Sequence, residues 1–356
     1  MLESIKIQNF RGFEDHIVPF HATTVLVGRN NAGKSTIVEA LRLISLAITY
    51  AKSRPHVPRI WRISRTARKA KNQAPTLLSL EDHADTVFHR YGDPPAVITA
   101  RFASGAEVEV VVNPEEISAS FSARSQADLQ HVSILPQVAP VSRQEKLLNP
   151  ETIHTNLSSL LASSHFRNQV HLLKEFFTDF KESAEESWPH LRIFAPEVFR
   201  KGFGNETLTL MVTDEDFTAE IAWMGHGLQM WLQAMWFLTR SRNHGTVILD
   251  EPDVYMHADL QRRFIRHVKR RHKQVIVASH SAEIMAEVEP EEILIINKSE
   301  KTSIFASNTP VAQQILNSLG SVHNLQFARL ATAKKFLLVE GEDVGVLKRF
   351  QNTLGS

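Results

Sequence analysis

Cysteine does not occur in the 356-residue sequence, which excludes disulfides and thiolate metal sites and fits a reducing compartment. Long apolar runs are also missing, since none approaches the ~18 residues of a membrane span. The amino terminus lacks a charged-then-apolar signal pattern. Neither sign of charge dominates, because the 40 Lys and Arg residues are nearly balanced by 39 Asp and Glu residues. We therefore expect a cytoplasmic protein with no membrane partner and no global attraction to nucleic acid.

The most informative stretch is Gly-Arg-Asn-Asn-Ala-Gly-Lys-Ser-Thr at 28–36, in which two glycines enclose four positions and precede Lys and Ser. The apolar run 23–27 predicts a buried strand before it, and 35–52 predicts a helix after it, as in a phosphate-binding loop. The glycines let successive backbone N–H groups point at phosphates, and the helix start adds partial positive charge. The sequence thus predicts a nucleoside triphosphate site, with a ligand-free Gly-rich turn as the alternative.

Two side chains of this loop have specific expected tasks. Lys34 would reach the β- and γ-phosphate oxygens of ATP, and the Ser35 hydroxyl would be a ligand of Mg²⁺. Five further residues of the loop are expected to contact the nucleotide: Asn30, Asn31, Ala32, Gly33 and Thr36.

A second motif, Gly-Thr-Val-Ile-Leu-Asp-Glu-Pro at 245–252, ends an apolar strand in two acids. Both carboxylates would emerge at the carboxyl end of the strand, where doubly wound sheets place their ligands. Asp250 would hold Mg²⁺ through its water shell, since hard oxygen ligands suit that ion. Glu251 would position or deprotonate the water that attacks the γ-phosphate. Solvated acids at a strand end are the alternative.

The order of the motifs resembles that of ABC-type ATPases related to the SMC and RecF proteins, and within them the OLD (overcoming lysogenization defect) family. Ile-x-Asn-Phe-Arg-Gly-Phe at 7–13 precedes the loop, and 253–258 resembles the family's Glu-x-x-Leu-His-Pro run, with Ala258 in place of Pro. The resemblance covers most of 1–340. It implies an α/β fold, an ABC-type P-loop ATPase head whose mixed β-sheet is flanked by helices, with an inserted helical dimerisation arm.

The resemblance assigns three more residues to the site. Arg11 would lie near the nucleotide phosphates, and Gln137 would touch Mg²⁺ and the attacking water. His280, after the apolar run 274–278, would hydrogen-bond the γ-phosphate and sense its presence, which would make it catalytic together with Lys34 and Glu251. A solvated arginine, a glutamine in a turn and an ordinary loop histidine are the respective alternatives.

The runs 207–213 and 218–223 predict two strands. After them, Gly225, His226 and Gly227 occupy the place of the family's Ser-Gly-Gly signature, which grips the γ-phosphate held by the opposite protomer. The usual serine is missing, which leaves backbone N–H groups and His226 for that contact. The resemblance therefore implies a head-to-tail homodimer that encloses two nucleotides. ATP would hold the protomers together, and hydrolysis would release them.

We expect four segments: the first half of the ATPase head at 1–149, a helical insertion at 150–190, the second half at 191–330, and the start of an incomplete Toprim-like domain at 331–356. The last resemblance rests on an apolar strand that ends in Glu-Gly-Glu-Asp at 340–343. A Toprim nuclease also needs a later Asp-x-Asp, so we expect no nuclease activity from this chain alone.

The first half contains a basic insert at 52–71, with eight basic residues and no acid. The spacing of Arg59, Arg62, Arg65 and then Arg68 or Lys69 predicts one basic helix face that could meet DNA, and a solvated surface is the alternative.

As a whole, the resemblance implies a Mg²⁺-dependent ATPase that controls a nuclease effector, in cis or as a separate subunit, in bacterial antiphage defence. The alternatives are a DNA repair ATPase of the SMC/RecF kind that binds DNA directly, and a nucleotide-gated scaffold with little turnover.

Overall fold

The computed structural model describes residues 1–64, 87–135, 138–157, 164–200 and 206–306. The chain divides into two units, Met1–Ser307 and Asn308–Ser356, and the fold described below belongs to the first. Gln137 and the Toprim-like residues 331–356 lie outside the described residues. No helix in the described part of the chain is both long and apolar enough to cross a membrane.

Five parallel strands and one antiparallel edge strand form the sheet that carries the predicted motifs. Its order is β18 (Ile304–Phe305), β17 (Ile293–Ile295), β3 (Thr23–Val27), β16 (Val275–Ala278), β15 (Thr246–Asp250) and β8 (Val132–Leu135). All residues of β3 and β16 are buried, because a parallel sheet is covered on both faces. The strands predicted from continuous apolar runs are therefore confirmed.

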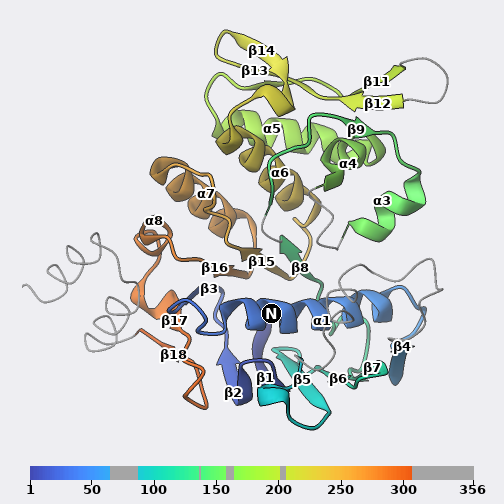
Figure 1. Cartoon of the computed structure of the whole chain (residues 1–356), viewed down its shortest axis with the longest axis vertical. Helices are drawn as coiled ribbons and strands as arrows, with labels where there is room; N and C mark the ends of the chain where they lie inside the picture. The colour runs from blue at the N-terminus through green and yellow to red at the C-terminus, as the bar shows by residue number, and fades with distance from the viewer. Residues whose placement is uncertain (65–86, 136–137, 158–163, 201–205, 307–356) are drawn as a thin grey trace, which may run out of the picture. The chain divides into compact units, whose positions relative to one another are not determined.

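A second six-stranded sheet is antiparallel, in the order β2 (Phe13–Pro19), β1 (Leu2–Phe10), β5 (Ala96–Phe102), β6 (Glu107–Val112), β7 (Glu116–Ser122) and β4 (Ile60–Ser64). Helix α1 (Lys34–Lys52) lies between the two sheets, as Figure 1 shows. Its apolar residues share one core with both sheets, including Ile98 of β5 and Ile248 of β15. The phosphate-binding loop is thereby anchored to a helix that is buried on two sides.

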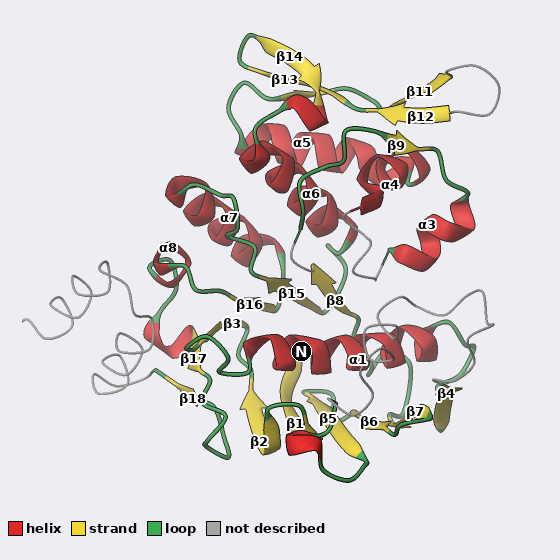
Figure 2. Ribbon diagram, in the orientation of Figure 1, coloured by secondary structure: helices red, strands yellow, loops and turns green. Residues whose placement is uncertain are grey.

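Helices α6 (His226–Arg240) and α7 (Ala258–Arg271) lie on the other face of the parallel sheet (Figure 2). The remaining helices of the described residues are α3 (Pro150–Asn156), α4 (Phe166–Leu172), α5 (Phe177–Ser187), α8 (Ala282–Met285) and the 3₁₀ turns His89–Tyr91, Lys174–Phe176, Ile221–Trp223 and Pro290–Glu292. Two small sheets adjoin them: β10 (Arg192–Ile193), β13 (Met211–Asp214) and β14 (Phe217–Glu220), then β11 (Glu197–Arg200), β12 (Glu206–Thr209) and β9 (Glu145–Lys146). The helices predicted for 150–190 are confirmed in its described part.

Two sequence predictions about local structure are wrong. The basic residues Arg59 and Arg62 do not share a helix face, because 60–64 is the edge strand β4, paired with β7. The run 207–213 is not one strand, since the chain breaks at the buried Leu210, whose N–H donates to Glu220 Oε1 at 3.3 Å. In both places long-range contacts outweigh local pattern.

A buried cation joins three elements of the helical region. Arg167 in α4 is 0% exposed and donates to both carboxylate oxygens of Glu220, at 2.7 and 2.9 Å. Its Nη1 lies 3.4 Å from Glu145 Oε2, and its Nη2 donates to the Ser142 carbonyl at 3.1 Å. Because Glu145 begins β9 and Glu220 ends β14, this one side chain ties both small sheets to α4.

Arg167→Ala should lower the free energy of unfolding by roughly 3–5 kcal/mol, because it leaves the buried carboxylate of Glu145 and the half-buried carboxylate of Glu220 without an ion-pair partner. Arg101→Ala is the matched control, since Arg101 is 69% exposed in its pair with Glu107 and should cost less than about 1 kcal/mol. Denaturant unfolding of both variants measures the difference. Equal losses would contradict the assigned role of Arg167.

Candidate functional site

The carboxyl ends of three neighbouring parallel strands bring the predicted motifs to one edge of the sheet. In the register of the sheet, Leu26 of β3 pairs with Ala278 of β16, which pairs with Asp250 of β15. The loop 28–36 begins two residues after Leu26, and His280 lies two residues after Ala278. Glu251 directly follows Asp250. The edge therefore combines a glycine-rich loop, an imidazole and two carboxylates.

The shape of the phosphate-binding loop depends on Gly33. This residue has φ 110°, in the left-handed region, and a Cβ added there would lie 2.4 Å from Cζ of Phe13. Phe13 is fully buried in the antiparallel sheet and cannot yield to it. The aromatic residue that ends the 7–13 motif thus lies directly beneath the loop, which gives that motif a physical link to the site.

Lys34 is the buried centre of the site. It is 6% exposed, and its Nζ donates to the Gly28 carbonyl at 3.1 Å and lies 2.6 Å from Nε2 of His280. Burial lowers the pKa of Lys34, while the nearby carboxylates of Glu251 and Asp250 raise it. Burial and the Lys34 charge lower the pKa of His280. This geometry fits a neutral His280 whose Nε2 accepts a hydrogen bond from the Lys34 ammonium group.

The two acids are held in different ways. Asp250 Oδ2 lies 3.3 Å from Nη2 of Arg42 in α1. Burial raises the pKa of Asp250, and the charge of Arg42 opposes that rise. Glu251 has φ 47°, a left-handed conformation that costs about 1–2 kcal/mol for a residue with a side chain. Its N–H donates to the Ala278 carbonyl at 2.8 Å, so pairing with β16 holds this strained backbone at the strand end.

The other residues expected in the loop present accessible groups. Asn30, Asn31 and Ser35 are exposed, and Ala32 and Thr36 are half-buried. The guanidinium group of Arg11 is already engaged in an ion pair, because its Nη2 lies 2.7 Å from Glu39 Oε1 in α1. Its backbone N–H donates to the Val87 carbonyl at 2.6 Å.

The signature-like residues lie beside the segment that follows the acids. The His226 ring packs edge-on against Tyr255 with ring centres 5.6 Å apart, and a Cβ on Gly227 would lie 3.3 Å from the Tyr255 carbonyl. Gly225 caps α6 and has open space around its Cα. Within the described residues, no hydrogen bond or ion pair joins these three residues to loop 28–36 of the same chain.

Arg42 and Glu39 are site residues that the sequence analysis missed. They are the only charged residues between Ser35 and Tyr50, in a helix that is otherwise largely apolar. Each pairs with a predicted site residue, Glu39 with Arg11 and Arg42 with Asp250. Charges inside an apolar helix were the available signal, because buried charges require partners.

The oxygen donors at this edge suit Mg²⁺ bound together with a nucleotide. Within the described residues, no group of three His, Cys, Asp or Glu side chains forms a metal site by itself. Mg²⁺ keeps several waters and takes one or two carboxylates plus substrate phosphates, a set that the Ser35 hydroxyl and the Asp250 carboxylate fit.

Fold and motif order define a mixed α/β P-loop ATPase fold. A family model described as an AAA ATPase domain matches residues 1–117, and one described as "AAA domain, putative AbiEii toxin, Type IV TA system" matches residues 110–286.

Individual proteins extend this comparison. An OLD nuclease from Thermus scotoductus is 25% identical, over 96% of this chain and 72% of that protein. An SMC head bound to the C-terminal winged-helix domain of ScpA has a TM-score of 0.53 and 15% identity, over 85% of this chain and 97% of that one. An SMC head from Pyrococcus yayanosii has a TM-score of 0.54 and 10% identity, over 89% and 99%. The chain is thus similar to AAA ATPase domains and to an OLD nuclease, and it has the fold of SMC heads.

Gly33→Ala should weaken ATP binding at least about tenfold, because the added methyl group displaces the loop from Phe13. Gly105→Ala is the matched control: Gly105 also has a positive φ, 79°, but has no atom within 4 Å of its Cβ position. Both variants carry about 1–2 kcal/mol of backbone strain. Calorimetric titration with ATP separates them, and equal affinities would contradict the assigned role of Gly33.

Proposed function

We propose that this chain hydrolyses ATP with Mg²⁺ at the edge formed by β3, β16 and β15. The observation that carries the proposal is the position of Lys34. Its buried ammonium group contacts Gly28 and His280, and the charges of Asp250 and Glu251 act on it. A cation in this place, at the start of a helix and beside two carboxylates, suits a triphosphate with its metal ion.

In this proposal the loop binds the phosphates and the acids serve the metal ion and the water. Lys34 exchanges the Gly28 carbonyl and His280 for β- and γ-phosphate oxygens, and the backbone of 30–36 surrounds them. Ser35 and Asp250 hold Mg²⁺, which neutralises phosphate charge when bound. Gln137 is expected beside them, and Arg11 near the phosphates.

Glu251 is the proposed general base for the attacking water. Its backbone conformation is held by the bond to Ala278, so the carboxylate has a defined starting point at the strand end. His280, once released by Lys34, is free to donate a hydrogen bond to the γ-phosphate. In this proposal, the substrate phosphates thus replace contacts that Lys34 and His280 make with each other when no nucleotide is bound.

We further propose that two chains form a head-to-tail dimer around two nucleotides. Gly225, His226 and Gly227 would contact the nucleotide of the partner, which agrees with their lack of hydrogen bonds to loop 28–36 of their own chain. The exposed ring of Tyr255, at 56%, lies beside them and extends the same surface. ATP would then hold the protomers together until hydrolysis.

The proposed effector of the ATPase is a nuclease. The name of the OLD nuclease relative supports control of a nuclease, in cis beyond the Toprim-like residues 331–356 or as a separate subunit. The SMC head bound to a ScpA domain supports the general case of an ATPase head that carries a partner protein. We place this function in the cytoplasm, in defence against phage DNA.

A nucleotide-gated scaffold with little turnover is the second candidate. The observation in its favour is that Gly225 stands where the signature serine is usual, so one hydroxyl contact to the γ-phosphate is missing. Direct DNA binding has less support, since 60–64 of the basic insert is an edge strand and Arg62 lies 3.8 Å from Glu116.

Glu251→Gln should retain ATP binding and lower phosphate release by at least about a hundredfold, because the amide cannot accept the water's proton. The mass by light scattering should double with Mg²⁺-ATP and stay doubled in this variant. Glu107→Gln, which changes a β6 side chain that is 39% exposed, is the matched control and should hydrolyse ATP like the unaltered chain. Normal turnover in Glu251→Gln would remove Glu251 from the role of base. A constant mass with no turnover in the unaltered chain would favour the scaffold.

A further inference from the structure

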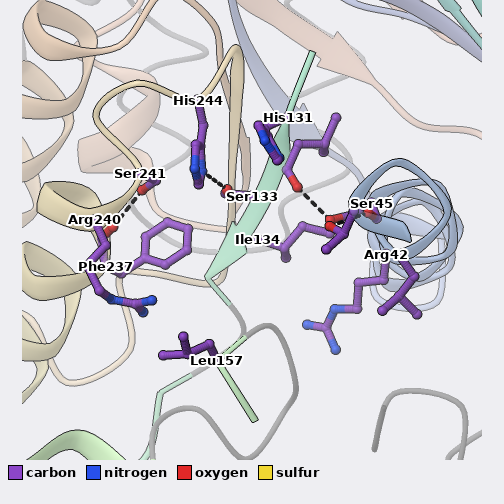
Figure 3. A pocket seen from close by; sticks show the side chains of 13 residues that line it. Arg42, Ser45, His131, Ser133, Ile134, Leu157, Phe237, Arg240, Ser241 and His244 are labelled. Carbon is purple, nitrogen blue, oxygen red and sulfur yellow. Dashed lines mark hydrogen bonds between the residues drawn. The ribbon is translucent and has the colours of Figure 1, made fainter. Parts of the chain in front are cut away.

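A cavity of about 180 Å³ lies at the edge of the parallel sheet, against β8 and between α1 and the carboxyl half of α6 (Figure 3). A single water molecule needs roughly 10–15 Å³ of such cavity volume, so the cavity has room for a small ligand. Its floor is partly apolar, with Ile134, Leu157 and Phe237 among the lining residues.

Among the described residues that line this cavity, the charged side chains are all basic. Arg42 from α1 and Arg240 from α6 reach it from opposite sides, and Figure 3 shows both guanidinium groups pointing into the space between them. His131 and His244 line it as well, and no Asp or Glu is among its described lining residues. The carboxylate that pairs with Arg42, Asp250, lies outside the lining.

Arg240 has no partner for its charge within the described residues. Its Nε is buried and makes no hydrogen bond there, and its guanidinium lies 5.7 Å from the centre of the Trp236 ring. Burial lowers the pKa of Arg240 to about 10, so the side chain still carries its charge at neutral pH. Because a half-buried charge without an ion-pair partner is unfavourable, this arrangement favours an anion beside Arg240.

We propose that this cavity binds the oxyanion group of a small ligand, a phosphate or a carboxylate, between Arg240 and Arg42. The planar fork of arginine matches two oxygens of either group. Several of the hydroxyls nearby are already used internally: Ser45 donates to the Val132 carbonyl at 2.5 Å, and Ser241 to the Phe237 carbonyl at 2.5 Å. Recognition therefore falls mainly on the arginines, and the apolar floor contacts the rest of the ligand.

The positive charge of the same cavity affects the pKa of a histidine that lines it. The rings of His131 and His244 stack 4.9 Å apart, and His244 Nδ1 hydrogen-bonds the Ser133 hydroxyl. Burial, followed by the charges of His131 and Arg240, lowers the pKa of His244 to about 4. An anion beside Arg240 offsets the electrostatic part of that shift, so the pKa of His244 rises on binding.

Arg42 connects this cavity to the ATPase site, because its Nη2 contacts Asp250 at 3.3 Å. A ligand that draws Arg42 toward Arg240 weakens that ion pair and frees Asp250 for Mg²⁺. Less Mg²⁺ is then needed for half-maximal hydrolysis. This consequence rests on the proposed function, whereas binding of the anion does not.

The test is calorimetric titration of the full chain with inorganic sulfate and, separately, with acetate. It is done in the Lys34→Ala variant, which lacks the ammonium group of the phosphate-binding loop and therefore binds oxyanions more weakly there. One anion-binding site should remain in this variant. Adding Arg240→Met should lower the affinity of that site for the anion at least about tenfold. Adding Arg242→Met, which removes a 63%-exposed arginine outside the cavity lining, is the matched control and should change it less than about twofold. Tighter sulfate indicates a phosphate-type ligand, and tighter acetate a carboxylate.

Absence of saturable sulfate and acetate binding in Lys34→Ala, or equal binding after Arg240→Met, would overturn the proposal. If Arg240→Met does not fold, NMR titration of His244 in Lys34→Ala replaces it. The pKa of His244 should then rise with added anion, and an unchanged value would also overturn the proposal. A chain that hydrolyses no ATP but passes these tests would contradict the proposed function alone.

Discussion

The site depends on the interactions that the buried ammonium group of Lys34 makes with its neighbours. An ion this well removed from water needs compensating groups on every side. The Gly28 carbonyl and His280 supply hydrogen bonds, and Asp250 and Glu251 supply opposite charge. These groups come from three separate stretches of the chain, so the parallel order of β3, β16 and β15 is a condition for the charge to be buried at all.

Helix α1 carries this constraint outward into the rest of the molecule. It starts at Lys34, lies between the two sheets, and presents two further charges to them. Glu39 holds Arg11 from the antiparallel sheet, while Arg42 holds Asp250 at the strand ends and also faces the cavity beside Arg240. One helix therefore links the phosphate-binding loop, the second acid motif and the basic cavity, which explains how an anion there could act on metal binding.

Much of the fold and the meeting of the motifs could be predicted from sequence. A strand buried on both faces is a continuous apolar run, and the carboxyl ends of parallel strands share an edge, which brings 28–36, Asp250 and His280 together. The strand β4 and the break at Leu210 could not be predicted, because pairing with β7 and the bond to Glu220 are long-range. The pairing of Arg42 was hidden likewise, since it depends on where α1 lies.

The most direct test of this account is a crystal structure of the chain with Mg²⁺ and a non-hydrolysable ATP analogue. The account predicts that Lys34 Nζ leaves His280 Nε2, now 2.6 Å away, for phosphate oxygens, and that the 3.3 Å contact between Arg42 and Asp250 opens as Asp250 turns to the metal ion. An analogue bound elsewhere, or bound at the loop with Lys34 still on Gly28 and His280, would contradict it.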